Sequence, residues 1–189
     1  MTQAPAAPRP AGTLSRPYRA VTVGIIGLES LVAFEYLAVN VAMPTVAREL
    51  DGVALYGLAF GAALAAAMAC TVISGIWSDV SGPGRPLWTG LTLFTAGLLG
   101  AGAASNMTAL IVGRAVQGLG GGLIVVALYV VVARAYPAEL KPRVFAAVAA
   151  AWVIPTIVGP AIAGLITTHL GWRWVFFSAA LLAPVGLLL

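Results

Sequence analysis

Charged residues are scarce in this sequence. They make up 8% of its 189 residues, whereas about a quarter of the residues in an ordinary soluble domain are charged. Hydrophobic residues make up 61%, so the chain has too little polar surface to cover a water-exposed core. The composition excludes a soluble globular domain and indicates an integral membrane protein.

Cysteine and histidine are almost absent, and each occurs once. The single cysteine, Cys70, excludes an intrachain disulfide, and its apolar neighbours are typical of a small buried hydrophobe. The histidine, His169, has no second metal ligand of a suitable kind, so we expect no metal site. The sequence also has no phosphate-binding Gly-Lys motif and no nucleophile with a base, so we predict neither a cofactor nor an enzyme.

Six apolar runs are long enough to be candidate transmembrane helices, because a bilayer core of about 30 Å needs about 20 apolar residues per helix. We therefore predict an all-α membrane protein whose six-helix bundle covers residues 21–189, after a disordered cytoplasmic tail at residues 1–20. The sixth run stops with the chain, so we expect the chain to be cut at or within helix six and to be part of a longer protein. The runs are Val21 to Met43, Leu55 to Trp77, Leu87 to Ser105, Ala109 to Ala133, Val144 to Thr168, and Trp174 to Leu189.

Basic residues are scattered in short loops rather than massed on one face. This pattern argues against a nucleic-acid partner and favours a topology signal. If the N-terminus is inside, the cytoplasmic segments hold seven basic residues and the outer loops hold two. We therefore predict a multi-pass protein of the plasma membrane, the inner membrane of the cell, with a cytoplasmic N-terminus. The inner set is Arg9, Arg16, Arg19, Arg85, Arg134, Lys141 and Arg143, and the outer set is Arg48 and Arg173.

Three ionisable residues lie inside the predicted spans: Glu29, Glu35 and Arg114. Each costs on the order of 3 kcal/mol at the centre of a membrane helix, so such groups usually face a cavity or a partner. We interpret them as proton-coupling residues of a transport pathway. The alternative is that they are structural ion pairs that lock helices together.

Helical geometry separates the two glutamates. At 100° per residue, Glu29 shares a stripe about 40° wide with Tyr36 and Asn40, which are candidate cavity or substrate contacts. Glu35 lies about 120° away from Glu29, so the two carboxylates have different surroundings.

The depth of Arg114 in helix four matches the depth of Glu35 in helix one. We therefore predict that these two side chains pair in the outer half of the bundle, with Gln117 on the same side of helix four as a further cavity candidate. Three glycines on helix four would let a neighbouring helix approach closely: Gly118, Gly121 and Gly122.

Helix five contains two prolines, which lack the N–H group that bonds back four residues. The carbonyls of Ala151 and Thr156 should therefore lose their usual partners, and we predict a kink. Two interpretations of this helix stay open: it is a hinge, or it is an ordinary membrane helix that tolerates proline. The residues concerned are Pro155, Gly159, Pro160 and Gly164.

Two connections have distinctive sequences. The stretch from Gly75 to Arg85 is predicted to be a short polar loop between helices two and three, with Asp79 and Gly82 within it. At the entrance to helix six, Trp172 and Trp174 are interpreted as an interfacial aromatic anchor.

Four stretches resemble the N-terminal half of a major facilitator superfamily transporter. Gly75-x-x-x-Asp79-x-x-Gly82-x-x-Arg85 resembles the signature between helices two and three, and Arg114-Ala-Val-Gln117-Gly118 resembles the helix-four motif associated with proton coupling. The stretch from Pro155 to Gly164 resembles the helix-five antiporter motif, and the stretch from Glu35 to Pro44 is similar to the helix-one motif of the drug/proton antiporters. In the first signature, Val80 and Pro83 stand where the family has basic residues.

The resemblance implies two inverted three-helix repeats that face a second six-helix half across a central cavity. It implies a secondary active transporter, with proton-coupled antiport, or efflux, of lipophilic or cationic small molecules driven by the proton gradient. The expected partners are the lipid bilayer, the small-molecule substrate, protons, and a C-terminal half or a second copy of this chain. Two alternatives stay open: a uniporter or nutrient symporter on the same scaffold, and a non-transporting interaction or sensing module.

Overall fold

The structure, a computed structural model, describes residue 13 and residues 15–184. Most of the predicted disordered tail and the last residues of the sixth run lie outside this part of the chain. The described part is helical and contains no strand. Its elements are α1 (Arg19–Glu49), η1 (Val53–Leu55), α2 (Tyr56–Ser81), α3 (Gly84–Gly102), α4 (Met107–Ala135), α5 (Lys141–Ala150), α6 (Val153–His169) and α7 (Arg173–Leu182).

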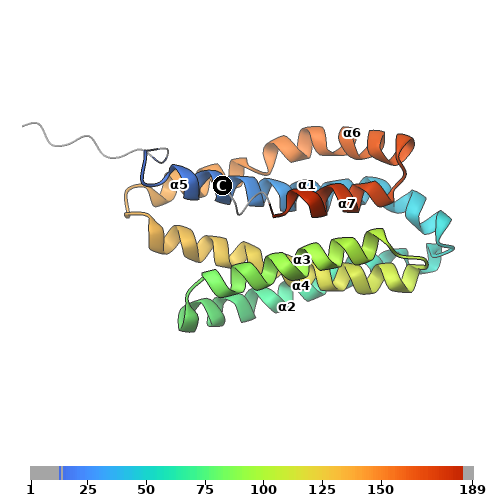
Figure 1. Ribbon diagram of the computed structural model, residues 1–189, viewed down its shortest axis with the longest axis horizontal. Helices are drawn as coiled ribbons and strands as arrows, with labels where there is room; N and C mark the ends of the chain where they lie inside the picture. Colours follow the sequence, from blue (N-terminus) through green and yellow to red (C-terminus); the bar gives the residue numbers. More distant parts are fainter. Residues whose placement is uncertain (1–12, 14, 185–189) are drawn as a thin grey trace, which may run out of the picture.

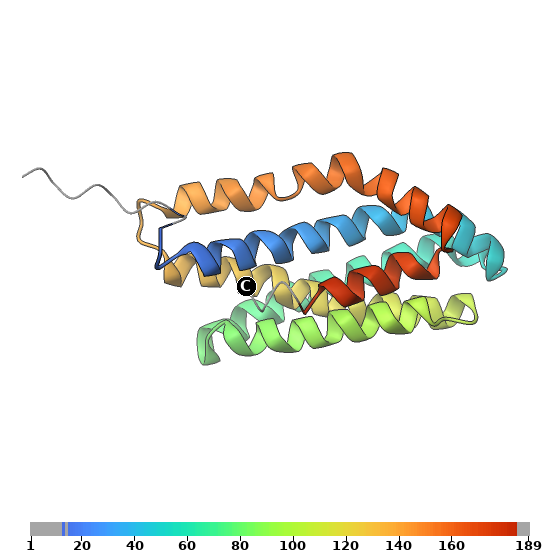
Figure 2. The ribbon, with the colours of Figure 1, turned by 45° about the horizontal axis from the view of Figure 1, so that its top comes forward.

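The helices form two groups that lie side by side along the long axis of the molecule. In one group α4 packs against both α2 and α3, and in the other α1 packs against α6. Helix α7 contacts α3 and α1 and so joins the groups. Successive crossings run in alternating directions, and α5 and α6 follow one another in a single crossing (Figures 1 and 2).

Four stretches are long and apolar enough to cross a membrane: Arg19–Glu49, Val53–Ser81, Met107–Ala135 and Lys141–His169. Helix α3 has 19 residues and α7 has 10. Each of the six predicted apolar runs coincides largely with helix over its described length, the fifth with both α5 and α6, so the all-helical prediction is confirmed. The arrangement of six spans in two inverted repeats stays a prediction.

The predicted end of the first helix is wrong. Helix α1 does not end at Met43 but continues through Pro44 to Glu49. A proline removes a single backbone hydrogen bond, and membrane helices tolerate this loss where neighbouring helices support them. Val46 and Ala47, which follow Pro44, are buried in the core and provide that support.

The stretch from Gly75 to Arg85 is mostly helical rather than a polar loop. Helix α2 includes Gly75 and Asp79 and ends at Ser81, and α3 begins at Gly84. Gly82 has a φ of 80°, a left-handed conformation that glycine adopts without steric cost. The chain reversal is therefore confined to Gly82 and Pro83, because no residue before them requires the helix to end.

Close backbone contacts fix the position of α4 against α2. A Cβ atom on Gly118 would overlap the backbone of Ala63, and one on Gly122 would overlap the backbone of Ala67. The predicted role of these two glycines in close packing is confirmed. Gly121 differs, because its added Cβ would lie 3.8 Å from the ring of Phe94, an ordinary contact.

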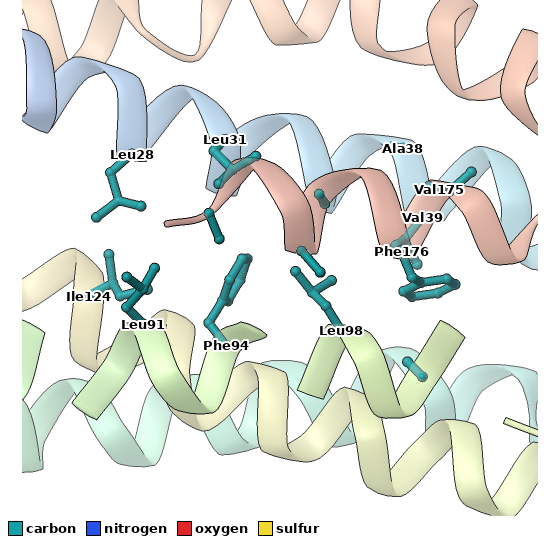
Figure 3. Close-up of a cluster of buried hydrophobic side chains, with 14 of the residues drawn as sticks. Leu28, Leu31, Ala38, Val39, Leu91, Phe94, Leu98, Ile124, Val175 and Phe176 are labelled. Atoms are coloured by element: carbon teal, nitrogen blue, oxygen red, sulfur yellow. The ribbon is translucent and has the colours of Figure 1, made fainter. Parts of the chain in front are cut away.

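A hydrophobic core joins the two groups of helices. Leu91, Phe94 and Leu98 of α3 point toward Leu28 and Leu31 of α1 and toward α7 (Figure 3). All five of these side chains are buried. This contact holds α1 beside the α2–α3–α4 group and so sets the distance between the polar groups of α1 and α4.

We predict that Gly118→Ala destabilises the protein by about 1–3 kcal/mol, the usual cost of overpacking. The added methyl group meets the backbone of α2, which cannot move aside without displacing the whole helix. Thermal unfolding in detergent micelles measures the effect. Gly27→Ala is the matched control, since an added Cβ there meets no atom within 4 Å, and equal melting temperatures for the two variants would contradict the packing argument.

Candidate functional site

A cavity of about 290 Å³ lies between α1, α2 and α4. Phe94 of α3 and Trp152, which follows the end of α5, complete its wall. Most of the lining side chains are apolar. The charged residues in the lining are Glu35 and Arg114, and Tyr36, Thr71 and Gln117 add polar groups.

Glu35 and Arg114 form the predicted pair. One terminal nitrogen of Arg114 lies 2.8 Å from Glu35 Oε1, and both side chains are only 4% exposed. The same nitrogen donates to Gln117 Oε1 at 2.6 Å, one turn further along α4. A buried charge pair of this geometry links α1 to α4, and removing one partner would leave the other charge without compensation.

Glu29 has different surroundings, as the helical geometry predicted. Its side chain is buried, and Oε2 accepts a hydrogen bond from the indole N–H of Trp152 at 3.2 Å. The other oxygen, Oε1, has no hydrogen-bond partner in the described part of the chain. Glu29 is not part of the cavity lining, so the structure does not bring it together with Glu35 and Arg114.

The other two residues of the predicted polar stripe are exposed. Tyr36 lines the cavity and is 47% exposed. Asn40 is absent from the lining, and its amide donates back to the carbonyl of Tyr36 at 2.6 Å. The side chain of Asn40 thus bonds to its own helix, and its contact with a substrate stays a prediction.

The helix-five residues lie beside this cavity rather than in it. The predicted interruption is confirmed as a break between α5 and α6 at Ala151 and Trp152, one turn before Pro155. Pro160 causes no second break, since it lies inside α6. Pro155 and Gly159 are buried on the face of α6 toward α1, whereas an added Cβ on Gly164 would meet no atom within 4 Å.

At the end of the bundle where α2 meets α3, Asp79 has a partner that the sequence analysis missed. Arg134, at the end of α4, lies 3.9 Å from Asp79 Oδ1 and donates to the carbonyl of Ser78 at 2.9 Å. Arg85, the basic residue of the same signature, is exposed and forms no ion pair within the described residues. The available signal for this pair was that Arg134 belongs to the basic residues predicted on the same side of the membrane as the Gly82 turn.

At the opposite end of the bundle, Trp172 is a buried structural residue and not an interfacial anchor. Its indole N–H donates to Glu49 Oε2 at 2.8 Å, and Arg173 lies over its ring at 4.4 Å from the centroid. The exposed carboxylate of Glu49 thus provides the polar partner of the buried ring. Trp174 is 47% exposed, which is consistent with an interfacial position.

The chain matches the Major Facilitator Superfamily over residues 25–189. An uncharacterised MFS-type transporter of Schizosaccharomyces pombe is 35% identical over 147 residues, which cover 78% of this chain and 25% of that protein. The MFS efflux transporter aclA of Aspergillus oryzae is 32% identical over 177 residues, which cover 93% of this chain and 32% of that protein. The chain spans about a quarter of the length of the first of these curated relatives.

Solved structures share the fold. The peptide transporter POT in complex with sulfate has a TM-score of 0.73 at 21% identity, over 89% of this chain and 36% of that one. A D-xylose-proton symporter has a TM-score of 0.67 at 18% identity, over 89% of this chain and 46% of that one. The family match over residues 25–189 shows that the chain belongs to the major facilitator superfamily.

Proposed function

We propose that the chain is the N-terminal six-helix half of a secondary active transporter that exports lipophilic or cationic small molecules in exchange for protons. The observation that carries the proposal is the buried Glu35–Arg114 pair in the wall of the cavity. Burying an ionisable pair at membrane depth costs free energy, so such a pair usually has a function or a structural role. Its position in a cavity lining favours a function.

The proposed mechanism is a competition between a proton and the substrate for Glu35. Protonation removes the charge of Glu35, and Arg114 then keeps only the neutral Gln117 as a polar partner. A cationic substrate that enters the cavity can instead approach the ionised carboxylate. The aromatic rings of Phe60, Phe94 and Trp152 in the lining suit a lipophilic or cationic molecule.

Two observations support export. The Aspergillus oryzae relative is named an efflux transporter, and the stretch from Pro155 to Gly164 resembles an antiporter motif. The break between α5 and α6 gives this stretch a place where the helix could bend, because its backbone bonding is interrupted there.

In the proposed assembly, a C-terminal six-helix half or a second copy of this chain covers the open side of the cavity. Helix α2 supports this proposal, since it exposes large apolar side chains along its length, among them Leu64, Met68 and Val72. We place the assembly in the plasma membrane with the N-terminus in the cytoplasm. The basic residues near the Gly82 turn and at the end of α4 support that orientation.

We predict that Glu35→Gln abolishes the dependence of export on a pH gradient, because glutamine has nearly the shape of glutamate but cannot carry a proton. The measurement is efflux of ethidium, a lipophilic cation, by the full-length transporter in proteoliposomes with an imposed pH gradient. Glu139→Gln, at an exposed position after α4, is the matched control. Unchanged pH dependence in Glu35→Gln would overturn the proposed coupling.

We also predict that Arg114→Ala destabilises the protein by about 3–5 kcal/mol, because it leaves the carboxylate of Glu35 buried without a counter-charge. The double variant Glu35→Leu/Arg114→Met should recover most of the stability, since it removes both charges. Thermal unfolding in micelles measures the stability of both variants.

The same double variant separates transport from a structural ion pair. If the pair carries the proton, the double variant should be stable yet unable to use an imposed pH gradient to export ethidium. Export at the wild-type rate would mean that the pair only locks α1 to α4.

A further inference from the structure

Two consecutive residues of α1 hold the two residues at the break between α5 and α6. Pro155 lacks the N–H group that would bond to the carbonyl of Ala151. The hydroxyl of Ser30 donates to that carbonyl at 3.1 Å. The next residue of the break, Trp152, donates its indole N–H to Glu29 at 3.2 Å. The break is thus supported from outside its own helix.

Trp152 is shared between this contact and the cavity. Trp152 as a whole is 37% exposed, and it lines the cavity together with Glu35 and Arg114. Glu29 is 1% exposed and does not line the cavity. Glu29 therefore reaches the cavity only through the indole that it holds.

The bond constrains the ring because little else in the surroundings is polar. The indole N–H is a single donor, so its acceptor fixes the direction of the ring edge. In the cavity lining, Glu35 Oε1 and Gln117 Oε1 both accept from Arg114, and neither accepts from the indole. Without Glu29, the indole N–H would lose the acceptor that it has in this structure.

We propose that Glu29 is a positioning residue, which holds the indole of Trp152 in the cavity wall and so sets the aromatic surface that a substrate meets. This inference rests on the proposed transport function and goes beyond it, because it gives the second buried carboxylate a role in substrate recognition rather than in proton transfer. What the role requires of residue 29 is a hydrogen-bond acceptor and not an exchangeable proton.

The transport experiment compares variants that keep or remove the acceptor, using ethidium efflux by the full-length transporter. Glu29→Leu and Trp152→Phe each remove the hydrogen bond and should raise the KM for ethidium roughly fivefold or more, as loss of an aromatic contact with a cation would, with a smaller effect on the maximal rate. Glu29→Gln keeps an acceptor and should restore the wild-type KM and the wild-type pH dependence.

The double variant Glu29→Leu/Trp152→Phe tests whether the two residues act together. Since both changes remove the same bond, its KM should be no higher than that of the worse single variant. Additive effects would overturn the inference, and so would a Glu29→Gln variant that loses its pH dependence, because that result would make Glu29 a proton carrier.

A second measurement does not depend on transport. Exchange of the Trp152 indole proton with water can be followed by NMR in a ¹⁵N-tryptophan-labelled transporter in lipid nanodiscs, with the signal assigned from Trp152→Phe. The proton should be protected in the wild type and in Glu29→Gln, and exchange faster in Glu29→Leu. Equal exchange in all three would overturn the inference. If the wild type fails to export ethidium, the proposed function fails for that cation, while the exchange rates still decide whether Glu29 holds the ring.

Discussion

The ion pair between Glu35 and Arg114 is the interaction on which the arrangement of this bundle depends, because it joins the two groups of helices at a depth where water is scarce. It can form only if α4 lies at a fixed distance from α1. Gly118 and Gly122 fix the position of α4 by allowing it to touch the backbone of α2. The hydrophobic core that side chains of α3 and α1 share fixes the position of α1. The packing thus brings the two charges together, and each charge offsets part of the free-energy cost of burying the other.

Polar contacts at the two ends of the bundle differ from the central pair in their exposure. At the end next to the Gly82 turn, the side chains of Arg134 and Asp79 are 49% and 82% exposed. At the opposite end, those of Arg173 and Glu49 are 44% and 54% exposed. Exposed pairs contribute about 0–1 kcal/mol, so these contacts can be broken and remade at little cost. A change of conformation would alter the ends readily, whereas separating the central pair would leave two buried charges without compensation.

Much of this structure could be predicted from the sequence, because the decisive signals are local. Apolar runs of about 20 residues identify helices, and the cost of a buried charge identifies Glu35 and Arg114 as a pair. What could not be predicted depends on contacts between distant residues. Pro44 stays inside α1 because its neighbours are buried, and Trp172 is interior because Glu49 lies beside it. Arg134 is the partner of Asp79 only because α4 ends next to the turn at Gly82.

The two buried carboxylates of α1 illustrate why burial alone does not identify a proton carrier. Both lie within membrane depth and both are nearly inaccessible, yet Glu35 faces a cavity and a cation, while Glu29 faces an indole. A carrier must meet water or substrate in at least one state, and the cavity gives Glu35 that access. Glu29 is separated from the same cavity by the ring of Trp152. Helical geometry places the two carboxylates on different faces of α1, and the structure shows that the break in the helix of Pro155 is what gives Glu29 its separate surroundings.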